Sequence, residues 1–161
     1  PIQGVIMIDS PIRPPDYDYS THTRSGPIRR IKTYPDKETI LERFRLTPEQ
    51  DCKNKYILDY IAKWSIRESN GGYEWKFDDS LFDKLGFGHM TRSIAFELSC
   101  KLGILFGTKS SMFSDEILNY ARSSAKKGTR IIPIEDAAHH IPLDQPVKLV
   151  QEILRMIDKW K

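Results

Sequence analysis

The sequence predicts an α/β protein in which three mostly parallel strands are flanked by helices and interrupted by a long, largely helical insertion. Three apolar runs, at residues 4–8, 102–106 and 130–134, have the length of buried strands. A segment with helical periodicity follows each of the last two runs, and this strand–helix–strand–helix order favours a parallel sheet with right-handed crossovers. We therefore expect a core strand, an insertion and a carboxyl-terminal core at residues 1–9, 10–98 and 99–161.

The composition is that of an ordinary globular domain. The chain has 161 residues, of which 39% are hydrophobic and 29% are charged, so it can enclose a real core. The net charge of +3 is small, and no basic run or aromatic–basic pattern indicates a nucleic-acid partner. No apolar run approaches the roughly 18 residues of a membrane span, and residues 4–8 are too short for a signal peptide. Cys52 and Cys100 lie far apart and outside any CxxC pair, so we expect no metal, no disulfide and a reducing, cytoplasmic location.

The first predicted strand, at residues 4–8, lies almost at the start of the chain. It is apolar throughout, as strands buried on both faces are, and such a strand needs neighbours on both sides. We therefore expect the chain to begin inside a larger fold. A polar, proline-rich loop follows as far as Pro35.

The insertion shows helical patterns with one hairpin between them. Apolar residues recur at three- and four-residue spacing over 55–64, as on one face of a helix. Asn70-Gly71-Gly72 lies between two short runs and predicts a hairpin. Thr47-Pro48-Glu49 is typical of a helix start. Further short helices are expected at residues 36–44, 78–85 and 91–98.

The last third alternates strands and helices. After the strand at 102–106, Ser114-Asp115-Glu116 opens a helix with acidic residues in its first turn, and Gly128 marks its end. The strand at 130–134 leads through a loop to a final helix that begins at Pro146. The apolar residues of that helix are Val150, Ile153, Leu154, Ile157 and Trp160.

The loop before the final helix carries two neighbouring histidines, His139 and His140. It follows a predicted strand, and ligands of open α/β sheets bind at the carboxyl ends of strands. A histidine held between a strand and a helix is a common general base. From spacing alone, two solvent-exposed loop histidines remain the simpler interpretation.

Three segments taken together indicate a family. Asp136-Ala137-Ala138-His139, followed by Leu143-Asp144-Gln145-Pro146, is similar to a histidine loop that reads three small residues and His, then acid–Gln–Pro. Asp136 stands in place of the first small residue. Leu105-Phe106-Gly107-Thr108-Lys109-Ser110 is similar to the end of a penultimate strand, and residues 4–11 to a strand that leads into a cap. Nearly all of the chain thereby resembles the carboxyl-terminal half of an α/β-hydrolase-fold protein, with the insertion as its cap.

The resemblance implies a catalytic role for His139, which would act as the general base, whereas His140 lies one residue too late. At the family's usual acid position this chain has Ser110, which cannot supply a negative charge. In a subset of the family, including some haloalkane dehalogenases, the acid follows the earlier strand, where Asp9 stands. Asp9 could instead only begin the proline-rich turn, and Asp115 is a second candidate that a helix-start role already explains.

The nucleophile is not found in the sequence, because no Gly-x-Ser-x-Gly elbow occurs. We expect the missing amino-terminal half of the fold to carry it, and this chain to be an inactive fragment when alone. The resemblance implies a hydrolase of an ester or similar small apolar substrate, without a cofactor. The alternatives are a haloalkane dehalogenase or epoxide hydrolase if the nucleophile is Asp, and a non-catalytic binding protein of the same fold. Aromatic residues of the cap could line a substrate pocket or form the cap's own core: Trp64, Tyr73, Trp75, Phe77 and Phe82.

Overall fold

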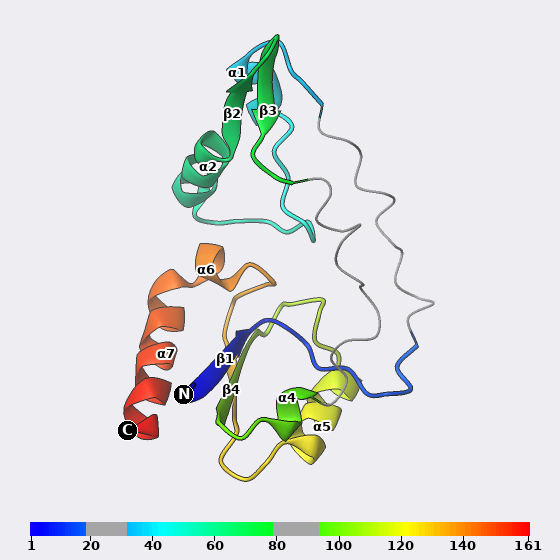
Figure 1. The fold of residues 1–161 in the computed structure, drawn as a ribbon, viewed down its shortest axis with the longest axis vertical. Coiled ribbons are helices and arrows are strands. Elements are labelled where there is room, and N and C mark those ends of the chain that lie inside the picture. The colour runs from blue at the N-terminus through cyan, green and yellow to red at the C-terminus, as the bar shows by residue number, and fades with distance from the viewer. Residues whose placement is uncertain (19–31, 79–93) are drawn as a thin grey trace. The chain divides into compact units, whose positions relative to one another are not determined.

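The computed structural model describes residues 1–18, 32–78 and 94–161. The chain divides into two compact units, of which the first joins residues 1–17 to 91–161 and the second covers 18–90 (Figure 1). The helix expected at 78–85, together with Phe82, lies almost wholly outside the described residues.

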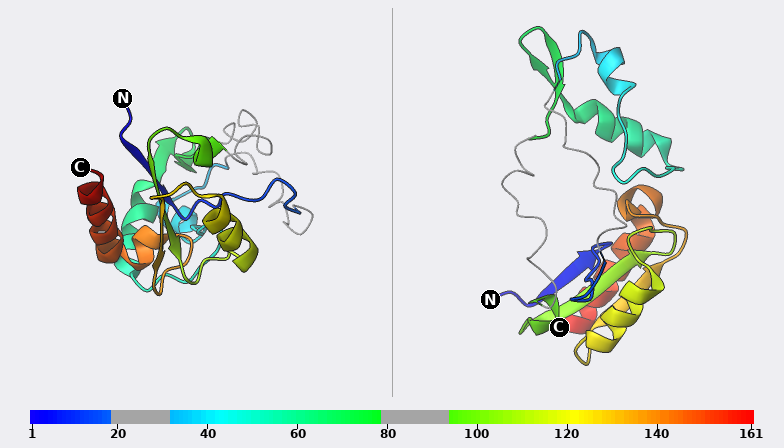
Figure 2. Two further views of the ribbon diagram at one scale, coloured as in Figure 1. Left: turned by 90° about the horizontal axis from the view of Figure 1, so that it is seen from below. Right: turned by 90° about the vertical axis from the view of Figure 1, so that its right-hand side faces the viewer.

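The first unit is built on a three-stranded sheet in the order β1-β4-β5. Strands β1 (Gly4–Ile8), β4 (Lys101–Gly107) and β5 (Arg130–Ile134) are all parallel. Helices α5 (Asp115–Ser124) and α7 (Pro146–Trp160) lie on opposite faces of the sheet, as Figure 2 shows. Two short helices, α4 (Ile94–Glu97) and α6 (Ile141–Asp144), precede β4 and α7. The predicted α/β class with three parallel strands and flanking helices is confirmed.

The core of this unit lies in two layers, one on each face of the sheet. Ile104 of β4 packs in one cluster with Ala121 of α5. Leu105, the next residue, faces the opposite side and packs in a second cluster with Met156 of α7. The alternation follows from the two-residue side-chain period of a strand. Both faces of β4 are therefore covered, which explains why its sequence is apolar after the exposed Lys101.

Helix α7 has apolar residues on two faces. Leu149 and Met156 are buried against the sheet, whereas Val150 and Leu154 are exposed in this structure. Periodicity marks which positions are apolar but does not decide which of two adjacent faces meets the sheet.

A buried carboxylate, Glu152, also lies on α7. Its Oε1 atom contacts Lys148 Nζ at 3.1 Å and Arg155 at 2.5 Å. Burial acts to raise the pKa of Glu152, but the hydrogen bond from Lys148 and the charge of Arg155 outweigh it, so the pKa lies below its usual value.

The second unit, in its described part, holds helices α1 (Lys37–Leu41) and α2 (Lys55–Trp64) and an antiparallel pair, β2 (Ile66–Ser69) and β3 (Gly72–Trp75). The predicted hairpin is confirmed, and Gly71 takes the positive φ of 91° that its turn needs. The helix start predicted at residues 47–49 is wrong, since the next helix begins at Lys55. Proline also favours turns, and the intervening Asp51, Cys52 and Asn54 are weak helix formers.

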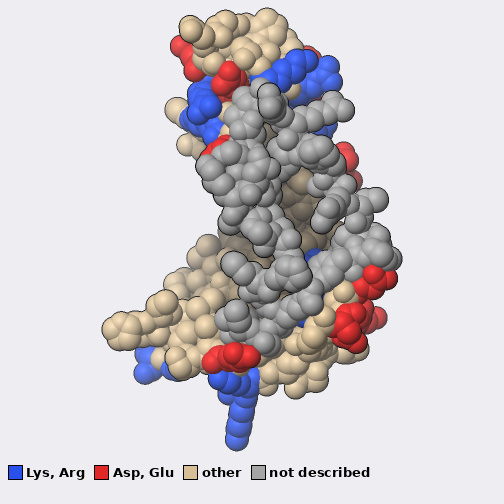
Figure 3. Space-filling model, turned by 45° about the vertical axis from the view of Figure 1, so that its right-hand side comes forward, with Lys and Arg blue, Asp and Glu red and all other residues tan. Residues whose placement is uncertain are grey.

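None of the helices in the described residues is long and apolar enough to cross a membrane. The face drawn in Figure 3 carries acidic and basic side chains in small, separate groups, in keeping with the mixed charge pattern of the sequence.

Candidate active site

The site is organised around Asp9, the first residue after β1. Its backbone N–H donates to the Leu105 carbonyl at 2.8 Å, which extends the pairing of β1 with β4 by one residue. The backbone then turns away with a φ of 46°, a left-handed conformation that Asp tolerates better than most residues. The side chain is 1% exposed, and it reaches over the carboxyl end of β4.

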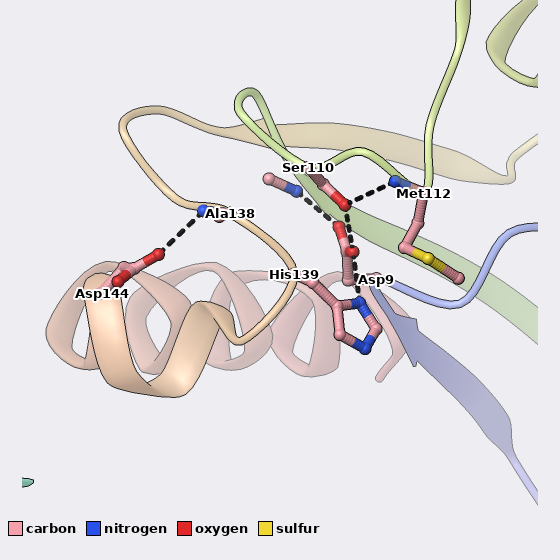
Figure 4. A network of polar contacts seen from close by, with 7 residues as sticks. Asp9, Ser110, Met112, Ala138, His139 and Asp144 are labelled. Atoms are coloured by element: carbon pink, nitrogen blue, oxygen red, sulfur yellow. Dashed lines mark hydrogen bonds and ion pairs between the residues drawn. The ribbon is translucent and has the colours of Figure 1, made fainter. Parts of the chain in front are cut away.

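A turn at residues 107–110 holds both oxygens of the Asp9 carboxylate (Figure 4). The turn is closed by the Ser110 N–H, which donates to the Gly107 carbonyl at 3.0 Å. The Gly107 N–H donates to Asp9 Oδ1 at 2.8 Å, and Ser110 Oγ lies 2.5 Å from Oδ2. The Met112 N–H in turn donates to Ser110 Oγ at 3.1 Å.

His139 completes this network from the loop after β5. Its Nδ1 atom lies 2.8 Å from Asp9 Oδ2, the same oxygen that Ser110 contacts. The side chain of His139 is 27% exposed, whereas that of Asp9 is buried. Figure 4 shows the other ring nitrogen, Nε2, pointing away from the carboxylate.

The turn at 107–110 also holds the loop that carries His139. The Thr108 N–H donates to the Ile134 carbonyl at 3.1 Å, and the Lys109 N–H donates to the Ala137 carbonyl at 2.9 Å. One short turn therefore fixes the acid on one side and the histidine loop on the other.

Close packing at Gly107 explains why the turn begins with glycine. A Cβ atom at this position would lie 2.3 Å from the Ala137 carbonyl oxygen and 2.6 Å from that of Ala138. Any larger residue would push the histidine loop away from the turn.

Asp136 and Asp144 support the histidine loop at its two ends. Asp136 takes a φ of 59°, its N–H donates to Thr108 Oγ1 at 3.1 Å, and its carboxylate contacts Lys109 Nζ at 2.6 Å. Asp144, on α6, accepts from the Ala138 N–H at 2.8 Å. The acid of the Asp144-Gln145-Pro146 segment thus fixes the backbone directly before His139.

The arrangement can transfer a proton at Nε2 of His139. An ionised carboxylate only accepts hydrogen bonds, so the Asp9 carboxylate would take them from Gly107, Ser110 and His139 Nδ1–H. With the proton on Nδ1, Nε2 keeps its lone pair and can accept a proton from a reacting group. Asp9 would then stabilise the imidazolium that forms.

The other candidates from the sequence lie elsewhere. The His140 ring packs edge-on against the His139 ring, with centroids 4.8 Å apart, and its carbonyl accepts from the first turn of α6. Asp115 lies in the first turn of α5, next to the Ser114 cap. The sequence did not predict the contact of Ser110 with Asp9. The position of Ser110, where the family usually has its acid, could have indicated it.

The described aromatic residues of the second unit differ in their surroundings. Trp64 and Phe77 are exposed, and the Trp75 ring contacts Phe44 with centroids 5.8 Å apart. In the described part of the chain, no group of three His, Cys, Asp or Glu residues could hold a metal ion.

Comparison with known proteins relies on structure, since no family model and no curated protein matches the sequence. The thioesterase domain from the curacin biosynthetic pathway matches 95% of this chain with a TM-score of 0.66 and 16% identity. E-2-(acetamidomethylene)succinate hydrolase matches 79% with a TM-score of 0.67 and 13% identity. An esterase from Mycobacterium tuberculosis matches 78% with a TM-score of 0.55 and 18% identity. The chain spans about half of their lengths, at 58%, 47% and 43% respectively. It therefore has part of an α/β-hydrolase fold.

Proposed function

We propose that this chain, as part of an α/β-hydrolase fold, supplies the acid–base pair of a hydrolase that acts on an ester or a similar small apolar substrate. The observation that carries the proposal is the contact of 2.8 Å between His139 Nδ1 and the buried Asp9 carboxylate at the carboxyl ends of β1 and β5. Structural neighbours that are esterases, a thioesterase and hydrolases support the reaction class.

In this proposal, His139 acts through Nε2. It removes the proton from a nucleophile as that group attacks the substrate carbonyl, and later returns a proton to the leaving group. The Asp9 carboxylate offsets the positive charge of the imidazolium. Its burial strengthens this effect, because water does not screen the pair on the side of the carboxylate.

The nucleophile would come from outside these 161 residues. Strand β1 is one of the two outer strands of the described sheet, so one row of its backbone groups has no strand partner there. Helix α7 leaves Val147, Val150 and Leu154 exposed at three- and four-residue spacing. We propose that the nucleophile-bearing part of the fold packs against these two elements, because an open edge beside an apolar stripe suits a further strand and helix.

The unit at residues 18–90 would serve as the cap. It is inserted in the chain after β1, the strand that Asp9 follows. A cytoplasmic location belongs to the same proposal, since Cys52 and Cys100 form no disulfide.

An aspartate nucleophile is the alternative that the position of Asp9 favours. The contact of His139 with an acid after β1 matches the subset of the family that includes haloalkane dehalogenases. Such an enzyme would release halide from a haloalkane or open an epoxide, and would leave a simple ester intact.

The test compares His139→Ala with His140→Ala in the complete gene product, using a p-nitrophenyl ester as substrate. We expect His139→Ala to lower kcat by roughly 10⁵- to 10⁶-fold, as the loss of a triad histidine does. His140→Ala is the matched control and should keep most of the activity. Equal activity of the two variants would remove His139 from the mechanism, while hydrolysis of haloalkanes or epoxides instead of esters would select the alternative.

A further inference from the structure

We infer that Ser110 is a positioning residue: its hydroxyl fixes the Asp9 carboxylate in the orientation that holds His139. This inference rests on the proposed function, in which the Asp9–His139 pair is the acid–base pair. It adds a third side chain to the site, one that never touches the substrate.

The geometry fixes the direction of the Ser110 hydrogen bond. Ser110 Oγ accepts from the Met112 N–H at 3.1 Å, which occupies one of its lone pairs. The hydroxyl proton is then available for Asp9 Oδ2, 2.5 Å away, and an ionised carboxylate can only accept it. Both Ser110 and Asp9 are buried, so water does not compete for this bond.

The carboxylate needs two anchors because its own torsion is soft. Rotation of an Asp side chain about its last bond has a broad, roughly two-fold profile, so one contact does not define the carboxylate plane. The Gly107 N–H holds Oδ1, and the Ser110 hydroxyl holds Oδ2. In this orientation, Oδ2 lies 2.8 Å from His139 Nδ1.

Both anchors come from one rigid turn. The hydrogen bond from the Ser110 N–H to the Gly107 carbonyl closes it at 3.0 Å, so the two donors cannot move independently. The same turn holds the histidine loop through the Lys109 N–H. The turn that carries Ser110 thus fixes both the orientation of the Asp9 carboxylate and the backbone of the histidine loop. This common support maintains the distance between Asp9 and His139.

The test uses three variants of the complete gene product. Ser110→Ala removes the hydroxyl with little change in volume, and Ser110→Thr keeps it. Ser123→Ala is the control, since the exposed Ser123 hydroxyl donates to the Tyr120 carbonyl within α5, away from Asp9. Two readouts are followed: kcat and KM for ester hydrolysis, and the Nδ1–H proton resonance of His139 by NMR.

We expect Ser110→Ala to lower kcat roughly tenfold with KM unchanged, because a hydrogen bond to a charged group that positions the base is lost. The Nδ1–H resonance should broaden or shift, and Ser110→Thr should restore both readouts. Wild-type values in Ser110→Ala, or equal impairment in Ser110→Thr, would overturn the inference. The NMR readout does not depend on turnover, so it separates this failure from that of the proposed hydrolase function, which His139→Ala tests.

Discussion

Two regions of the same sheet differ in how far their groups are paired or covered: the carboxyl ends of the strands, and the outer side formed by the β1 edge and the exposed face of α7. At the carboxyl ends, side chains and backbone groups from β1, β4 and β5 satisfy one another in a closed network around Asp9. On the outer side, β1 is an edge strand and α7 exposes an apolar stripe that includes Leu154. The described residues therefore hold a closed network of hydrogen bonds around Asp9 and His139, together with an edge strand and an exposed apolar helix face.

The contrast shows which part of the proposed chemistry is local. The position of His139 depends on contacts made within one unit, through the turn at 107–110. Delivery of a nucleophile to Nε2 would depend on whatever covers β1 and α7. Substitutions at the two places should therefore fail in different ways: those at the site in rate, and those on the outer side in stability of the complete fold.

After the loss of His139 itself, the largest effect should come from Asp9→Asn. The variant keeps the shape and the left-handed backbone but loses the charge that stabilises the imidazolium, so kcat should fall by about 10⁴-fold in the complete gene product. Asp115→Asn is the control, because Asp115 lies on α5, where Ser114 provides the cap. A full loss in Asp115→Asn with an active Asp9→Asn would return the acid role to Asp115.

A smaller effect is expected from Gly107→Ala. Gly107 belongs to the turn that contacts both Asp9 and the histidine loop. The added methyl would meet two loop carbonyl oxygens at 2.3 and 2.6 Å, and such overpacking costs about 1–3 kcal/mol. Thermal unfolding should show this loss together with reduced turnover. Lys109→Ala removes an exposed ion pair and should leave the melting temperature nearly unchanged. Equal melting temperatures for the two variants would show that the turn and the loop can accommodate the added methyl group at no cost in stability.

The outer side is tested by Leu154→Ala in the complete gene product. Leu154 is 55% exposed in this chain, yet if the remaining fold covers α7, its loss should cost about 2 kcal/mol in chemical denaturation. Asn119→Ala on the exposed side of α5 should stay within about 0.5 kcal/mol. A Leu154 cost as small as that of Asn119 would mean that nothing packs on this face.

The smallest effect should be the pH dependence of Glu152→Gln. Because the folded-state pKa of Glu152 lies below its usual 4.5, its ionised form stabilises the fold above that pH. This contribution is lost as pH falls through the lower folded-state pKa. Urea unfolding of wild type and variant should therefore differ near neutral pH and converge in acid, whereas a constant difference would contradict the role of the ion pairs.

Much of the framework could be predicted from the sequence because strands and their ends leave local signals. The strand at 130–134 has the predicted bounds, and a run ending at residue 8 placed Asp9 directly after a strand. Since carboxyl ends of parallel strands share one edge of a sheet, Asp9 and the histidine loop could be expected to meet. The structure places His139 Nδ1 on Asp9 as expected; that the pair is catalytic stays a prediction.

The rest depends on contacts that leave no pattern in the sequence. The hydrogen bond of Ser110 to Asp9 joins residues about a hundred positions apart, and it depends on the register of β1 against β4. The exposed face of α7 could not be separated from its buried face, because both carry apolar residues. Thr47-Pro48 indicated a helix start where the structure has none, since proline suits turns as well.

The tautomer of neutral His139 tests the central claim most directly. In the complete gene product labelled with ¹⁵N-histidine, NMR above the pH at which His139 is protonated distinguishes a proton on Nδ1 from one on Nε2. We expect the proton on Nδ1, donated to Asp9, and a shift of the population toward Nε2–H in Asp9→Asn. A neutral His139 protonated on Nε2, or a tautomer that Asp9→Asn leaves unchanged, would contradict the role of Asp9 and His139 as one acid–base pair.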